Sequence, residues 1–237
     1  MQILKNLFQV GGDLNGITFD GKDAGYNDGN TYIIKRGEGL IMFDAGCGDT
    51  MEQIFDNMKY WNLNPNDIKY CILTHAHFDH TGGGHILKER GVKFISISET
   101  ADAVSKGDDR TCPYLYHKNF VPFEVDRIIK DGEKFEVLGL EFEAVNFTGH
   151  SMGCTAYFFN YEKKKIVVSG DVIGTLLAGY FGWDGSIDFN KEKYLESLKK
   201  FSKIDTDMML PGHGLIYFHK PRRRVEEALN IALIEWR

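Results

Sequence analysis

Residues 74–83 have the sequence THAHFDHTGG, which places three histidines and an aspartate within six positions. The apolar run at 70–73 precedes this stretch and predicts a short buried strand. On extended backbone, side chains two positions apart lie on the same side, so His75, His77 and Asp79 can point into one pocket. Imidazole and carboxylate groups are the usual ligands of zinc and related divalent ions. The stretch therefore predicts a metal site at the end of a strand.

His80 extends this set, because Thr81 and the glycines after it allow the chain to turn. The alternative interpretation is a polar strand end whose histidines are satisfied by ordinary hydrogen bonds. Four potential ligands crowded together, with no matching countercharges nearby in the sequence, favour metal binding over that alternative.

The composition is ordinary for a soluble globular protein, with 43% hydrophobic and 26% charged residues. The 237 residues are enough for a sizeable core, and we expect one domain over residues 1–237. The net charge of −6 does not suggest nucleic-acid binding. The expected partner is a small-molecule substrate. No stretch has the apolar length of a membrane span, the N-terminus lacks a signal pattern, and the four cysteines form no Cys-x-x-Cys motif. These features predict a cytoplasmic protein without a membrane partner, and they leave the oligomeric state open.

The order of patterns along the chain favours an α/β fold. A hairpin is predicted over 31–43, followed by a helix from Thr50 with Gln53 in a capping box. Residues 98–126 have weak periodicity and predict a long surface excursion. A second hairpin with an Asp beside Gly, at 154–171, resembles the first and favours two related halves, with chance similarity as the alternative. Strands precede and separate helices in both halves, which predicts sheets sandwiched between helices.

Three later polar residues also follow predicted strands. His150 comes after the strand ending at Phe147, Asp171 after the apolar run at 166–168, and His213 after the run at 208–210. Ligands and active sites collect at the strand ends of α/β sheets. Each residue alone would be a weak signal, since a loop His or Asp beside Gly is usually a turn residue.

The pattern His-x-His-x-Asp-His, with a distant His, Asp and His at strand ends, resembles the metallo-β-lactamase-fold hydrolases, and the glyoxalase II-like branch fits best. The resemblance extends from the hairpin at Thr31 to His213. It implies a four-layer αβ/βα sandwich in which two mixed sheets lie between helices. It also implies a two-metal site between the sheets.

The resemblance further implies a role for each ligand. His75, His77 and His150 would hold one metal, Asp79, His80 and His213 would hold the other, and Asp171 would bridge them. Zinc is the usual ion in the family, and iron or manganese occurs in relatives; these ligands suit several metals. Asp79 would also act catalytically by passing a proton to the leaving group. Asp44 is a candidate outer acceptor for a ligand imidazole, with turn capping as the alternative.

The predicted function is a binuclear metal-dependent hydrolase that cleaves a small ester-like bond, such as a thioester or a lactone. A phosphodiesterase on the same metals and a metal-stabilised binding module remain alternatives. Only 24 residues follow His213, which disfavours the glutathione-binding helical domain of glyoxalase II. Related lactonases carry a tyrosine where this chain has Gly174, and true β-lactamases usually lack the bridging aspartate.

The loop after Asp171 is rich in glycine and aromatic residues. Tyr180, Phe181 and Trp183 are predicted to form one wall of an apolar substrate pocket. The alternative is a loop held in place by its own aromatic side chains. Tyr114 and Tyr116 are further candidates for the mouth of the same pocket.

Overall fold

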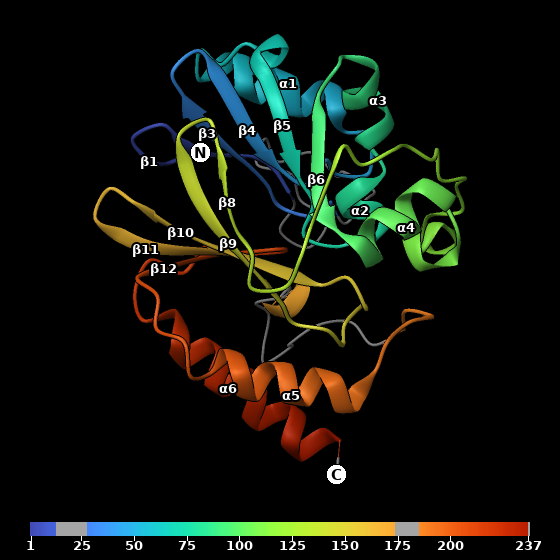
Figure 1. Cartoon of the computed structure of the whole chain (residues 1–237), viewed down its shortest axis with the longest axis vertical. Helices are drawn as coiled ribbons and strands as arrows, with labels where there is room; N and C mark the ends of the chain where they lie inside the picture. Colours follow the sequence, from blue (N-terminus) through green and yellow to red (C-terminus); the bar gives the residue numbers. More distant parts are fainter. Residues whose placement is uncertain (13–27, 174–184, 237) are drawn as a thin grey trace.

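A computed structural model of the chain shows two β-sheets packed face to face, with helices on their outer faces (Figure 1). The structure describes residues 1–12, 28–173 and 185–236. The first sheet has seven strands in chain order: β1 (Gln2–Leu4), β2 (Leu7–Gly11), β3 (Thr31–Arg36), β4 (Gly39–Phe43), β5 (Ile68–Ile72), β6 (Lys93–Ile97) and β7 (Arg127–Ile129). The second sheet has the order β12 (Met208–Pro211), β11 (Lys164–Gly170), β10 (Thr155–Tyr161), β9 (Leu140–Asn146) and β8 (Lys134–Val137).

Both sheets are mixed, and their parallel pairs place strand ends at a common edge. In the first sheet β4, β5, β6 and β7 run parallel, while β1 to β4 pair antiparallel. In the second sheet only β11 and β12 are parallel. Two backbone hydrogen bonds join the sheets near these ends, from Thr155 N to Thr74 O (2.9 Å) and from Asn30 N to Gly212 O (2.5 Å).

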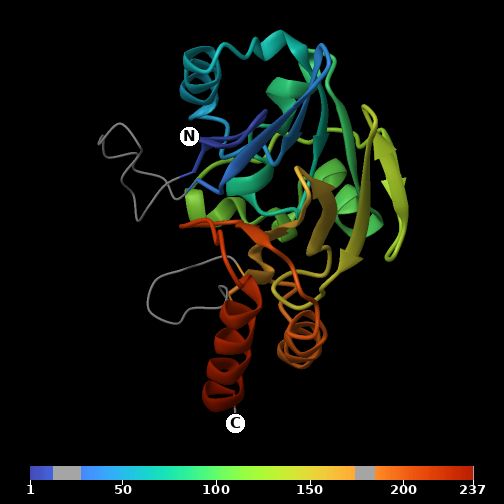
Figure 2. The ribbon, with the colours of Figure 1, turned by 90° about the vertical axis from the view of Figure 1, so that its left-hand side faces the viewer.

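The helices are α1 (Met51–Tyr60), α2 (Phe78–Thr81), α3 (Gly84–Glu89), α4 (Ser98–Lys106), α5 (Lys191–Phe201) and α6 (Pro221–Glu235). Three hydrophobic layers separate the four structural layers. One packs α1, through Ile54 and Phe55, against the outer face of the first sheet. The middle layer joins the two sheets, and the third packs α5 and α6 against the second sheet. The predicted four-layer αβ/βα sandwich is confirmed, and Figure 2 shows α5 and α6 side by side on its outer side.

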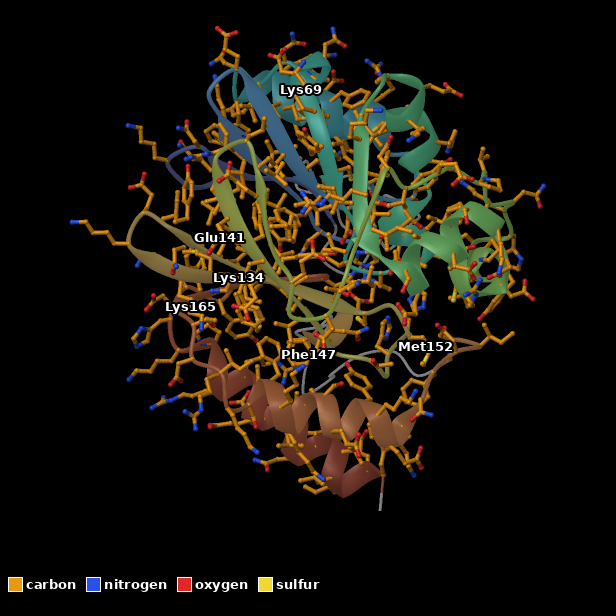
Figure 3. The ribbon with its side chains drawn as sticks, in the orientation of Figure 1. Lys69, Lys134, Glu141, Phe147, Met152 and Lys165 are labelled. Carbon is orange, nitrogen blue, oxygen red and sulfur yellow. The ribbon has the colours of Figure 1, made fainter. Side chains whose placement is uncertain are left out.

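The outer aromatic packing is visible in the view with side chains. Phe147, labelled in Figure 3, lies between the second sheet and α5. Its ring stacks on Phe201 of α5 with 4.8 Å between ring centroids. This contact fixes the end of the strand that leads toward His150. Among the described residues, none of the helices has the length and apolarity needed to cross a bilayer.

Two local expectations were wrong. The capping box at Thr50 does not form, because the Thr50 hydroxyl donates to the Asp28 carboxylate instead of capping α1. Residues 98–126 are also not only a surface excursion, since they begin with α4, which buries Ala101 and Val104. Small alanines give a weak apolar stripe, and α4 was missed for that reason. The prediction of one domain over residues 1–237 stays a prediction.

Candidate metal centre

The predicted ligands lie at the edge where the two sheets meet. His75 and His77 follow β5, and Asp79 and His80 stand in α2, which begins directly afterwards at Phe78. From the second sheet, Asp171 follows β11 and His213 follows β12. His150 is in the loop between β9 and β10. Each half of the chain therefore contributes side chains to one small volume.

Three groups of side chains have ligand atoms close enough to share an ion, all within 4.8 Å of one another in each group. They are His75 with His77 and His150; His75 with His80 and Asp171; and Asp79 with His80 and His213. The middle group connects the other two. The His213 side chain is 17% exposed whereas that of His80 is fully buried, so the centre has an edge toward solvent at His213.

Asp44 orients two of the imidazoles. Its Oδ2 accepts from the Thr74 hydroxyl (2.7 Å) and lies 2.8 Å from Nδ1 of His80, while its Oδ1 accepts from Thr74 N (2.8 Å). Because the Thr74 proton is directed to Asp44, the Thr74 oxygen is left to accept from Nδ1 of His75, 3.1 Å away. Both rings then carry their proton on Nδ1, and Nε2 is left as the ligand atom. The outer-acceptor role predicted for Asp44 fits this geometry.

Two buried atoms in the centre have no hydrogen-bond partner, His75 Nε2 and Asp171 Oδ1. Leaving a buried polar atom unsatisfied costs about 1–3 kcal/mol. A side chain at Gly212 would clash with Asp171 Oδ1, so glycine keeps the space beside this oxygen open. A divalent cation would satisfy both atoms, and the residues therefore fit a metal.

The charges of the centre are also suited to cations. Burial, followed by the neighbouring His150, lowers the pKa of His77 to about 3, which keeps this imidazole in the neutral form that binds metals. Burial opposes ionisation of Asp171, yet His213 and His80 hold its pKa well below the usual value. Burial likewise opposes the charge of His213, but Asp171 and Asp79 raise its pKa to about 10. The two carboxylates thus require positive charge, which a metal would supply in place of protonated imidazoles.

Tyr116 lies next to the metal-binding stretch. Its ring stacks on Phe78 with 4.9 Å between centroids. Burial, and after it the charge of Asp79, raises the pKa of Tyr116, so its phenol keeps the proton and remains a hydrogen-bond donor. The approach of Tyr116 to the pocket mouth stays a prediction. Tyr194 by contrast is fully buried, and its hydroxyl donates to backbone carbonyl groups of Asp171 and Val172.

The structure brings together all seven side chains that the sequence singled out as ligands. The predicted pocket wall of Tyr180, Phe181 and Trp183 lies outside the described residues. The sequence reasoning missed Ser186, which contacts His77 from the segment before α5, and Asp188, which accepts from the Ser186 hydroxyl. A serine and an aspartate in a polar loop have no distinctive spacing, so no sequence signal marked them.

Comparison with known proteins shows the family to which the sequence is similar. The family model described as the metallo-beta-lactamase superfamily matches residues 24–213. An atrochrysone carboxyl ACP thioesterase from Aspergillus fumigatus is 28% identical over 203 residues, covering 85% of this chain and 55% of that protein. A hydroxyacylglutathione hydrolase from Prochlorococcus marinus is 24% identical over 193 residues, covering 81% of this chain and 64% of that protein. The chain spans about half the length of most curated relatives it matches.

Solved structures share the fold. A class B3 di-zinc metallo-beta-lactamase from an Alaskan soil metagenome superposes with a TM-score of 0.71 at 21% sequence identity. The match covers 87% of this chain and 86% of that protein. At this level of identity the likeness concerns the arrangement of sheets and helices.

Proposed function

Because the chain belongs to the metallo-beta-lactamase superfamily, we propose that it is a hydrolase with two divalent metal ions that cleaves an ester-type bond in a small molecule. Thioesters are the first candidates, with lactones and related acyl compounds next. One similar protein is named as an ACP thioesterase and another as a hydroxyacylglutathione hydrolase, and both names describe hydrolysis of acyl compounds.

The observation that carries the proposal is that seven ligand side chains meet around two buried atoms without a hydrogen bond, His75 Nε2 and Asp171 Oδ1, the latter 3.3 Å from Nε2 of His80. In the proposed assignment His75, His77 and His150 hold one ion. Asp79, His80 and His213 hold the other, and Asp171 is shared. Zinc is the proposed ion, supported by the imidazole-rich donor set and by the di-zinc neighbour; iron and manganese remain alternatives.

When bound, such ions lower the pKa of water toward neutrality and polarise the carbonyl oxygen of an acyl substrate. The protein's own contribution is orientation and proton transfer. Asp79, whose Oδ2 lies 2.9 Å from Nε2 of His213, is the proposed group that passes a proton to the leaving group. The Tyr116 phenol is the proposed donor to the substrate at the mouth. Asp44 holds the imidazoles of His75 and His80 in place while the substrate reacts.

The test is a hydrolysis panel on the metal-loaded protein, with a chelated sample as the control. The panel contains an acyl-coenzyme A thioester, S-lactoylglutathione, a lactone, a phosphodiester and a penicillin. We expect the highest kcat/KM with a thioester, and loss of that rate on chelation. Turnover of the phosphodiester alone would replace the proposal with a phosphodiesterase. Tight metal binding with no turnover of any compound would favour a binding module.

A further inference from the structure

The segment between Gly185 and Asn190 reaches into the metal centre from the side of α5. The hydroxyl oxygen of Ser186 lies 3.2 Å from Nε2 of His77, and Ser186 is 7% exposed. The same hydroxyl donates to Oδ1 of Asp188 over 2.5 Å. None of these contacts involves Asp79, His80 or His213, which hold the other metal in the proposed assignment.

The direction of these hydrogen bonds determines which ring nitrogen of His77 carries the hydrogen. Because the Ser186 proton is directed to Asp188, the Ser186 oxygen acts as an acceptor toward Nε2 of His77, as it does toward the Cys112 thiol 3.8 Å away. Nε2 of His77 therefore carries a hydrogen. The other ring nitrogen, Nδ1, then presents its lone pair. This atom lies 3.0 Å from Nε2 of His150, inside the group formed with His75.

Asp188 also reaches the loop that carries His150. Its Oδ2 accepts from the backbone N–H of Met152 over 2.9 Å, and Asn190 N donates to Gly149 O over 2.8 Å. Figure 3 shows Met152 beside the segment that leads into α5. Asp188 therefore connects the ring of His77, through Ser186, with the backbone two residues after His150.

From this geometry we infer that Ser186 and Asp188 are positioning residues for one metal only. They hold His77 in the tautomer that presents Nδ1, and they fix the His150 loop beside it. The inference rests on the proposed metal site, but it does not depend on which bond the protein hydrolyses. Asp44 performs the corresponding task for His75 through Thr74, which makes the two arrangements parallel: carboxylate, hydroxyl, imidazole.

The test measures the affinity of each metal separately, by competition with a chromophoric chelator, and records the absorption spectrum of the cobalt-substituted protein. In Ser186→Ala, we expect the affinity of one metal to fall by about 10- to 100-fold while the other is unchanged. The cobalt spectrum should change for the weakened site only. Ser186→Thr keeps the hydroxyl and should restore the affinity, whereas Asp188→Ala should resemble Ser186→Ala.

Ile187→Ala is the matched control, because Ile187 lies between the two positioning residues and its side chain is directed outward, with 65% exposed. It should leave both affinities unchanged. Equal affinities in Ser186→Ala and Ile187→Ala would overturn the inference. Equal weakening of both metals, together with a lower Tm of the metal-free protein, would also overturn it, because it would show a general structural role. Failure of the hydrolysis panel would leave these readouts intact.

Discussion

At the scale of single residues, Asp44 differs from Ser186 because it serves both groups of ligands. It contacts His80 directly and His75 through Thr74, and these two histidines belong to different proposed metals. In Asp44→Asn the negative charge is lost, and the amide cannot accept from Thr74 and His80 as the carboxylate does. We expect both metal affinities to fall by about 10- to 100-fold, measured by chelator competition.

The matched control is Asp56→Asn, because Asp56 is 71% exposed and pairs with Lys59 on the surface. This substitution should leave both metal affinities as they are in the unsubstituted protein. If Asp44→Asn weakens one metal and spares the other, the shared role of Asp44 is wrong.

Asp171 is the residue on which the two-metal arrangement depends. It is the only proposed ligand assigned to both ions, and its Oδ1 is buried without a hydrogen-bond partner. In Asp171→Ala we expect most of the hydrolytic activity to be lost and the second metal to bind weakly, as measured by metal content after dialysis. Asp205→Ala, at a position 79% exposed, serves as the control. Full activity with two retained metals in Asp171→Ala would contradict the assignment.

The sequence predicted the ligands from two features, the dense cluster at residues 75–80 and the places of His150, Asp171 and His213 after predicted strands. His75 and His77 follow β5 and hold one ligand group together, as their spacing of two predicted. Asp79 and His80 lie in the helix α2, so the turn into that helix, and not an extended period, directs them to the other group. The partners of these ligands could not be predicted in the same way. Ser186 reaches His77 across 109 positions of the chain, and this contact exists only because the sheets meet at one edge.

At the scale of elements, α5 anchors the loop that carries His150. Its N-cap is Asn190, whose side-chain oxygen accepts from Lys193 N over 2.9 Å. Replacing an N-cap Asn by Ala costs about 1 kcal/mol. We therefore expect Asn190→Ala to lower the free energy of unfolding by about that amount in a urea titration. The slope of that free energy against urea concentration should be unchanged.

Asn190→Ser is the comparison, because serine can cap the same helix and should recover most of the loss. Both variants keep the backbone bond from residue 190 to Gly149, so the metal affinities should change little. A loss of stability in Asn190→Ser equal to that in Asn190→Ala would mean that the side-chain cap contributes nothing.

The elements predicted from sequence were those with a strong period or a clear turn. The hairpin of β3 and β4 has both signals, and the structure confirms it. The helix-capping preference of Thr50 was overridden, because its hydroxyl donates to the buried carboxylate of Asp28 instead of capping α1. Such a competitor from a distant loop leaves no trace in the local pattern.

At the scale of the whole molecule, the centre lies between two halves that are otherwise joined mainly by apolar packing. The middle layer includes Phe43 of the first sheet and Phe142 of the second, with 5.8 Å between ring centroids. Neither half holds a complete ligand group, because His150, Asp171 and His213 come from the second sheet while the four clustered ligands come from the first. Bound metals would therefore connect the halves at one edge of this apolar layer.

This arrangement predicts that metal removal loosens both halves together. A ligand that binds only the folded state adds about 2.7 kcal/mol at a free concentration of 100 times Kd. For a chain of this size each kcal/mol corresponds to about 2–4 °C in Tm, so chelation should lower Tm by about 5–10 °C for each metal lost. On metal removal, amide hydrogen exchange should accelerate in residues 74–81 and, to a similar extent, in the loops around His150 and His213. Acceleration confined to one half, or an unchanged Tm, would mean that the ligands of the two sheets do not share their ions.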